Sequence, residues 1–305
     1  MTGKMVLALT CMLAFVGSAL GDVSMFKLSQ GTDPTKMTIT WSSTAGDTQA
    51  STCKYGRDVI NGTPLLNMMA EGMPDSYQFQ SYDTSANKLA VYSSPQFHYV
   101  VLTNLVPGAR YYYQCGDFGT VKPVDVAAYK RPDVGTVTSF KTLPAVGSAT
   151  DLDGNYLTFG VTMDSGTNTW AKAPVTYNAA TSMQGLVYDL ATETKNKGSL
   201  KSSDNYAVLS GILANTDAPV SMVLHAGDMS YADCVHAVWD DFDLTLEQLS
   251  KKIPMMFSAG NHEQEVTWAN GGSKTAFTAM EKVPYIPPPC NPQITPRRRC
   301  PTYCL

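Results

Sequence analysis

The sequence has 305 residues and a formal net charge of −4, with 44% hydrophobic and 16% charged residues. This composition excludes a chain that stays unfolded through charge repulsion, because it holds enough apolar surface to build a core. It also argues against a nucleic-acid binder, which needs a basic face to displace counterions from phosphates. The length allows two domains of ordinary size.

The N-terminus has the pattern of a secretory signal peptide. Lys4 precedes a mostly apolar run, Met5–Val16, and Ala19-Leu20-Gly21 then offers small residues for cleavage before Asp22. We therefore expect residues 1–21 to be a signal peptide and the protein to be secreted. The alternative, a membrane anchor, is disfavoured because the run is short for a bilayer. No later segment has 18 uninterrupted apolar residues, so no membrane association is expected after cleavage.

Secretion affects the interpretation of the cysteines, because an oxidising compartment permits disulfides. Six of the seven follow the signal peptide: Cys53, Cys115, Cys234, Cys290, Cys300 and Cys304. Six thiols allow fifteen pairings, so the pairing stays open, although Cys53 and Cys115 lie in the same predicted region and could pair there. A zinc site near the C-terminus is disfavoured, because its cysteines have no CxxC spacing and no neighbouring His. Asn61-Gly62-Thr63 is a glycosylation sequon, which suits a secreted loop.

Residues 22–145 have the pattern of an all-β domain. Four short segments are rich in β-branched and aromatic residues, as strands are: Met37–Trp41, His98–Leu102, Arg110–Cys115 and Thr138–Thr142. Asn104–Gly108 contains the Pro-Gly chemistry of a turn. Short strands separated by turns indicate a small sandwich. His98 has no potential ligand residue nearby in the sequence, so we expect it to be a strand residue rather than a metal ligand.

The pattern changes after a predicted linker at Leu143–Asn155. Three apolar runs now end in polar turns that contain Gly: Tyr156–Val161, Val220–Leu224 and Ile253–Phe257. Between the last two, apolar residues at helical spacing predict a helix within Val235–Lys251. A strand, a helix and a strand in this order indicate a βαβ unit and a largely parallel sheet. The polar segment Thr192–Asn205 is expected to be a surface insertion.

Each apolar run is followed by residues that can bind a hard metal ion. These residues are Asp164 after the first run, Asp228 and Tyr231 after the second, and Asn261 and His262 after the third. The carboxyl ends of parallel strands meet at one edge of a sheet, so we expect these side chains to lie close together. Carboxylate, amide and phenol oxygens suit hard cations, and a phenolate suits trivalent iron. The sequence therefore predicts a metal site at this edge.

A site of this kind suits the cleavage of phosphate esters. Two metal ions a few Å apart can polarise a phosphoryl oxygen, activate a water and stabilise the leaving oxygen. A neighbouring His can bind the phosphate or protonate the leaving group. Each motif is a weak signal alone, because an Asp in a turn is more often a turn former or a helix cap. Their order, each just after a predicted strand, makes the signal specific.

With these motifs, the sequence resembles the purple acid phosphatases, a family of calcineurin-like metallophosphoesterases. The likeness extends to the flanking stretches His225-Ala226, Ser230–Asp233 and Trp239–Phe242, and to Leu105–Tyr113 in the β region. It runs from about Ser24 to about Met280. The resemblance implies an N-terminal all-β fibronectin-III-like sandwich at residues 22–145. An incomplete α/β metallophosphoesterase domain would follow at residues 150–286.

The resemblance also implies a role for each candidate residue. Asp164 and Tyr231 would bind Fe(III), and Asp228 would bridge it to a second divalent metal, which is Zn, Mn or Fe. Asn261 would bind the second metal, and His262 would contact the phosphate as a catalytic residue. The implied activity is that of a secreted acid phosphatase acting on phosphate monoesters. The sequence does not indicate the oligomeric state or the physiological substrate.

The sequence departs from the family pattern at its C-terminal end. The family takes three further ligands from a Val-x-x-His motif and a Gly-His-x-His motif, but none of the four His in this sequence follows position 262. Residues 287–305 form an atypical Pro, Arg and Cys tail without helix or strand periodicity. We therefore expect a C-terminally truncated phosphatase that lacks the distal His ligands. The alternative is a catalytically inactive truncated paralogue, or a secreted binding module built on the β domain.

Overall fold

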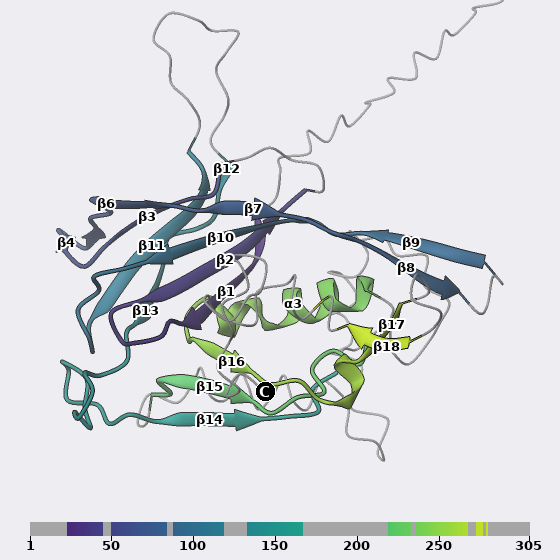
Figure 1. Cartoon of the computed structure of the whole chain (residues 1–305). Helices are drawn as coiled ribbons and strands as arrows, with labels where there is room; N and C mark the ends of the chain where they lie inside the picture. The colour runs from purple at the N-terminus through teal and green to yellow at the C-terminus, as the bar shows by residue number, and fades with distance from the viewer. Residues whose placement is uncertain are drawn as a thin grey trace, which may run out of the picture.

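The computed structural model describes residues 23–44, 50–83, 88–118, 133–166, 219–232, 236–267, 273–276 and 279 (Figure 1). The predicted signal peptide, the insertion at Thr192–Asn205 and the tail at 287–305 lie outside these residues. So do four of the six remaining cysteines: Cys234, Cys290, Cys300 and Cys304. None of the helices in the described ranges is long and apolar enough to cross a membrane.

Two antiparallel sheets form a sandwich in the first part of the chain (Figure 1). One sheet has the order β1 (Ser24–Gln30), β2 (Met37–Ser43), β10 (Gln96–Leu102) and β7 (Met73–Asp75). The other has the order β12 (Asp133–Val134), β11 (Arg110–Asp117), β3 (Thr52–Gly56) and β6 (Met68–Glu71), and β13 (Thr138–Lys141) also pairs with β11. Two hairpins complete the region: β4 (Val59–Ile60) with β5 (Thr63–Pro64), and β8 (Gln78–Asp83) with β9 (Lys88–Ser93). The predicted all-β region and its four predicted strands are confirmed.

The first strand is buried along nearly its whole length. Phe26 and Leu28 contribute to the core between the two sheets. Because side chains alternate along a strand, Met25 and Lys27 point to the opposite face. There Met25 joins a second core, which contains residues of the C-terminal region. The sheet that contains β1 therefore packs on both of its faces.

Cys53 and Cys115 form a disulfide between neighbouring strands of the second sheet. They lie opposite each other in the β3–β11 register, and both are fully buried. This is the pairing that the sequence allowed within the β region.

Replacing both cysteines with alanine is expected to lower the free energy of unfolding by about 3 kcal/mol, because the cross-link restricts the unfolded chain over a long loop. The two residues are 62 positions apart in the sequence. Urea unfolding followed by circular dichroism measures the change. A double variant with the same unfolding midpoint as the wild type would contradict the prediction.

The second region contains a parallel sheet with the order β14 (Phe159–Thr162), β15 (Met222–His225) and β16 (Met255–Phe257). Helix α3 (Ala237–Ser250) connects β15 to β16, and η4 (Asn261–Glu263), β17 (Glu265–Thr267) and β18 (Ser273–Ala276) follow. The predicted helix and the predicted βαβ unit are thus present. Within the described ranges this region holds three parallel strands and one long helix, so the predicted α/β domain is not confirmed, and the described chain as a whole is mostly β.

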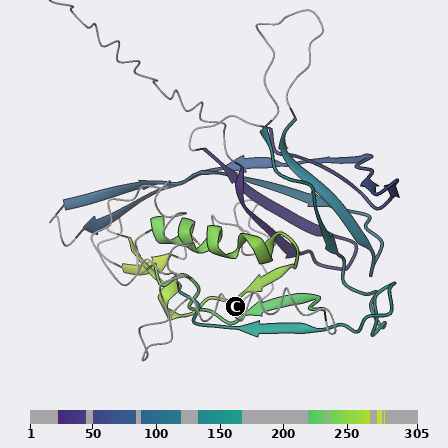
Figure 2. The same cartoon turned by 180° about the vertical axis from the view of Figure 1, so that it is seen from behind.

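Helix α3 lies between the sandwich and the parallel sheet, as the two opposite views show (Figures 1 and 2). It carries an apolar face because its hydrophobic residues recur at helical spacing. That face belongs to a core that also takes residues from the sandwich and from the parallel sheet: Trp239, Phe242, Leu246 and Leu249 of α3 with Met25, Phe97, Tyr99, Val223 and Met255. The two regions are therefore joined by a shared core.

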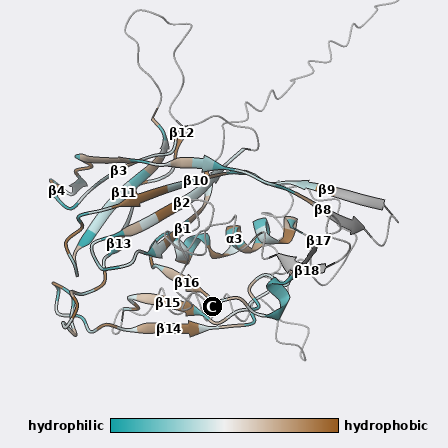
Figure 3. Ribbon diagram, viewed as in Figure 1, coloured by the Kyte–Doolittle hydropathy of each residue, from teal (hydrophilic) through white to brown (hydrophobic). Residues whose placement is uncertain are grey.

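Apolar side chains are exposed on the face of the parallel sheet that points away from α3. Phe159, Val161 and Leu224 are 45%, 65% and 37% exposed on it, and Figure 3 shows hydrophobic stretches on β14 and β15. Within the described ranges no element covers these side chains. Parallel sheets are normally covered on both faces, so this apolar surface is expected to promote aggregation.

Candidate metal centre

The three loops that follow β14, β15 and β16 meet at the carboxyl end of the parallel sheet. The amide groups of Asp164 and Ser165 donate to the carbonyl oxygens of Gly227 (3.2 Å) and Asp228 (3.1 Å). The first loop therefore continues the pairing of β14 with β15 beyond the ends of the strands. This arrangement brings the first and second predicted motifs side by side.

Three of the five candidate residues adopt a left-handed backbone conformation. Asp164, Asp228 and Tyr231 have φ values of 51°, 51° and 53°. Such values are uncommon for residues other than Gly, and they are costly for a bulky residue such as Tyr. Strained backbone of this kind occurs where the surrounding structure holds a side chain in a required position, often at functional sites. The strain supports a functional interpretation of these two loops.

The candidate side chains contact one another. The Tyr231 hydroxyl donates to Asp164 Oδ1 at 2.7 Å. The backbone amide of His262 donates to Asp228 Oδ1 at 3.0 Å, which ties the third loop to the second. The rings of Tyr231 and His262 lie 4.5 Å apart between their centres. Asn261 is exposed beside His262 in η4. The structure thus brings the three predicted motifs to one place.

Two glycines allow the loops to approach this closely. A side chain at Gly227 would meet the backbone of Gly260, and a side chain at Gly260 would meet the carboxylate and amide of Asp228. Gly227 also has a φ of 99°, which favours glycine. Both glycines precede a candidate residue in the sequence, and their positions explain why the motifs begin with Gly.

Glu263 holds the second and third loops together, a role that the sequence did not reveal. The residue is 1% exposed, and its carboxylate accepts three backbone N–H bonds, from Asp228 (2.8 Å), Met229 (2.8 Å) and Gly260 (2.6 Å). Burial raises the pKa of Glu263, whereas the three N–H donors act in the opposite direction. The available sequence signal was its spacing, since Glu263 is the third residue after Gly260 and caps the short helix η4.

His225 and Ser165 link the first and second loops below the candidate residues. His225 Nε2 and Ser165 Oγ are 2.7 Å apart, and both residues are buried. Burial lowers the pKa of His225 to about 4, against the opposing effect of the Asp164 and Asp228 carboxylates. The ring is therefore neutral at physiological pH, and its contact with Ser165 helps to position Asp164, the neighbouring residue.

The electrostatics of the centre favour binding of a cation. Burial raises the pKa of the Tyr231 phenol, and its hydrogen bond to the Asp164 carboxylate raises it further. The phenol therefore keeps its proton unless a positive charge replaces that proton between Tyr231 and Asp164. A hard cation would supply this charge, and carboxylate, phenolate and amide oxygens are the ligands that it prefers.

The donor set is rich in oxygen and poor in nitrogen. Within the described ranges, no three His, Cys, Asp or Glu side chains form a metal-binding group by themselves. All the candidate donors are oxygen donors: Asp164, Asp228, Tyr231 and Asn261. The phenol of Tyr231 and the amide of Asn261 would add their oxygens to the two carboxylates. This set fits one trivalent iron better than it fits two metal ions.

The two other histidines in the described ranges are packing residues, and for His98 this agrees with the prediction of a strand residue. His98 is fully buried, stacks on Trp41 and contacts the hydroxyls of Ser43 and Ser51 at 2.9 Å each. His236 is buried at the start of α3, where its Nδ1 lies 2.8 Å from the Tyr77 hydroxyl.

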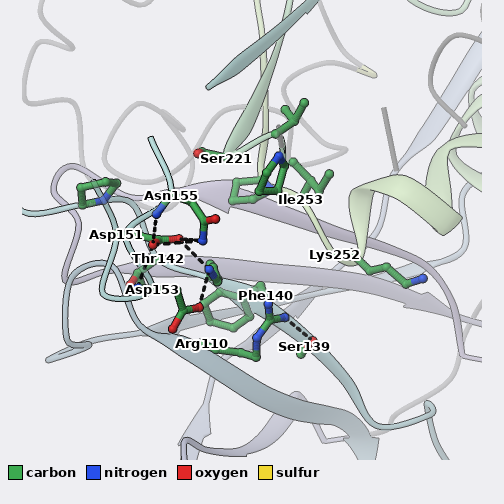
Figure 4. Close-up of a pocket in the computed structure, with 15 residues that line it drawn as sticks. Arg110, Ser139, Phe140, Thr142, Asp151, Asp153, Asn155, Ser221, Lys252 and Ile253 are labelled. Carbon is green, nitrogen blue, oxygen red and sulfur yellow. Dashed lines mark hydrogen bonds and ion pairs between the residues drawn. The ribbon is translucent and has the colours of Figure 1, made fainter. Parts of the chain in front are cut away.

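A separate cavity of about 460 Å³ lies at the opposite end of the parallel sheet (Figure 4). Ser221, which precedes β15, and Ile253, which precedes β16, line it together with residues of β11, β13 and the linker. Its central polar groups are bonded within the protein, since Lys141 Nζ lies 2.6 Å from both Asp151 and Asp153. The cavity is therefore distinct from the candidate metal centre.

Residues 24–142 match the family model described as "Purple acid Phosphatase, N-terminal domain". The chain is similar to the purple acid phosphatases. It is 24% identical over 255 residues to probable purple acid phosphatase 20 of Arabidopsis thaliana, covering 83% of this chain and 42% of that protein. It is 39% identical over 61 residues to probable inactive purple acid phosphatase 1 of the same plant, covering 20% of this chain and 9% of that one.

The fold is also that of a solved purple acid phosphatase. The structure of the enzyme from yellow lupin (Lupinus luteus) seeds matches with a TM-score of 0.55 and 16% identity, covering 88% of this chain and 41% of that chain. The present chain thus spans about two fifths of the length of probable purple acid phosphatase 20 and of the lupin enzyme. The expected relationship to the family is confirmed.

Proposed function

We propose that this chain provides part of the dinuclear metal centre of a secreted acid phosphatase that hydrolyses phosphate monoesters. The observation that carries the proposal is the contact of Tyr231 with Asp164 beside Asp228, at the carboxyl ends of three parallel strands. The names of the matched purple acid phosphatases support the reaction class.

Each candidate residue has a proposed part in this function. Asp164 and Tyr231 would hold Fe(III), Asp228 would bridge to a divalent metal, and Asn261 would hold that second ion. The metal pair, when bound, supplies the positive charge that stabilises a phosphoryl group under attack. His262, which lies against the Tyr231 ring, would donate a hydrogen bond to the phosphate.

A second candidate function is a binding role without catalysis. The donor set favours it, because the candidate donors in the described residues are all oxygen donors and suit one iron ion. Some matched relatives also carry the name "probable inactive purple acid phosphatase". We propose that the 305-residue polypeptide alone binds Fe(III) but hydrolyses an aryl phosphate at acid pH at no more than a trace rate. Robust metal-dependent turnover would exclude this second function.

Iron binding can be tested separately from activity. The chain loaded with one equivalent of Fe(III) is expected to show visible absorption from the Tyr231 phenolate, and Tyr231→Phe is expected to abolish it. Tyr112→Phe, which changes a tyrosine on β11 far from the centre, is the matched control and should keep the absorption. If Tyr231→Phe kept the full absorption, the proposed centre would be wrong.

A further inference from the structure

Helix α3 meets the sandwich through an interface that contains buried charges. Lys27 Nζ on β1 lies 2.6 Å from Asp243 Oδ2 on α3, and the two side chains are only 3% and 1% exposed. Near the end of the helix, the Ser250 hydroxyl donates to the carbonyl of Phe26 at 2.7 Å. The polar contacts of β1 therefore extend along much of the helix.

Asp240 lies in the same interface and is 4% exposed. Its Oδ1 accepts a hydrogen bond from the Tyr92 hydroxyl on β9 at 2.8 Å. The charged groups that act on it are Lys27 from β1 and two further carboxylates of α3, Asp241 and Asp243. Asp240, Asp241 and Asp243 are thus three buried carboxylates of one helix, and among the described residues the ammonium group of Lys27 is bound to Asp243.

Burial beside two other carboxylates makes ionised Asp240 unfavourable. A buried carboxylate loses its hydration, and this loss is compensated only by a well-placed cation and several hydrogen bonds. Desolvation is the main reason why the pKa of Asp240 rises to about 8, and the neighbouring carboxylates raise it further. The hydrogen bond from Tyr92 and the charge of Lys27 oppose the rise.

We propose that the packing of α3 onto the sandwich takes up a proton at Asp240, so that the two regions hold together more firmly in acid than at alkaline pH. Helix α3 starts soon after the loop that carries Asp228 and Tyr231. Its attachment therefore bears directly on the position of that loop. If the proposed acid phosphatase function holds, the interface would keep α3 attached under the acidic conditions in which the protein works.

The direction of the effect follows from the two protonation states. An unfolded Asp titrates at about pH 3.9, whereas Asp240 in the folded protein keeps its proton to a higher pH. Between these values the unfolded chain binds fewer protons than the folded chain. This contribution to stability is fully present below about pH 4 and is lost as the pH rises towards 8, so the unfolding constant should rise by up to about tenfold per pH unit.

The test compares urea unfolding of the full chain at pH values from 5 to 9. Asp240→Asn copies the neutral side chain, so the variant should be more stable than the wild type at pH 8. Its unfolding constant should lose most of the wild-type dependence on pH between 5 and 8. Asp58→Asn, at an exposed position of the β region, is the matched control and should keep the wild-type dependence. An Asp240→Asn variant with the same pH dependence as the wild type would overturn the proposal.

A second variant covers the case in which Asp240→Asn does not fold. Tyr92→Phe removes the hydrogen bond that favours the ionised form of Asp240. The stability of this variant should then continue to fall up to a higher pH than that of the wild type. If the stability of Tyr92→Phe stopped falling at the same pH as that of the wild type, the proposal would also be overturned. Neither variant touches the candidate metal ligands, so iron binding at pH 5 should stay unchanged in both.

Discussion

Glu263→Ala is expected to lower the free energy of unfolding by about 5 kcal/mol, because three backbone N–H groups lose a buried charged acceptor and hydrogen bonds to charged groups contribute about 1.5–3 kcal/mol each. The three donors belong to Asp228, Met229 and Gly260, which hold the second and third loops of the candidate centre. The variant is therefore also expected to lose Fe(III) binding. Urea unfolding and iron titration measure the two effects.

The control for this prediction is Glu71→Ala. Glu71 is an exposed residue on β6, so its loss should change stability by no more than about 0.5 kcal/mol. Glu263→Gln keeps one acceptor oxygen and should fall between the wild type and Glu263→Ala. Wild-type stability together with wild-type iron affinity in Glu263→Ala would show that Glu263 does not hold the loops.

Lys27→Met is expected to lower the free energy of unfolding at pH 7 by about 4 kcal/mol, because it leaves the Asp243 carboxylate buried without its cation. The matched control is Lys36→Met. Lys36 pairs with Asp33 at 3.2 Å on the surface, where the side chains are 41% and 39% exposed. An exposed pair of this kind contributes about 0–1 kcal/mol. Chemical unfolding of both variants gives the comparison.

A double variant distinguishes the effect of the unpaired buried charge on stability from the effect of changed packing. Lys27→Met with Asp243→Leu removes both members of the ion pair, and part of the lost stability should return because Asp243 no longer leaves a buried charge without its cation. Equal destabilisation by Lys27→Met and Lys36→Met would contradict the account of this interface.

The elements that could be predicted from the sequence are those with a clear pattern. The strands β2, β10 and β11 are rich in β-branched and aromatic residues, and α3 has apolar residues at helical spacing. That the five candidate residues lie close together could be predicted, because each follows a predicted strand. The structure places four of them in mutual contact, with Asn261 beside them in η4.

The missed features depend on contacts between distant parts of the chain. Strand β1 was not predicted, because it is buried on both faces and its Lys27 resembles a surface residue. The partner of Lys27 is 216 residues away in the sequence, so no local pattern indicates it. Glu263 was missed for a similar reason, since two of its three donors belong to the previous loop.

The exposed apolar residues of the parallel sheet affect the tendency of the isolated chain to aggregate. Phe159 and Val161 are exposed there, and this chain spans about two fifths of the length of probable purple acid phosphatase 20 and of the lupin enzyme. A dye that binds apolar surface should therefore bind the purified chain strongly. Substitution of Val161 with Thr should reduce the binding, because it removes apolar area from an exposed strand.

The central claim is that the loops after β14, β15 and β16 together hold a metal ion. The most direct test is anomalous diffraction at the iron edge from crystals of the chain loaded with Fe(III). The account predicts an iron peak between Asp164, Asp228 and Tyr231. Iron bound elsewhere in the protein, with none between these three side chains, would contradict it.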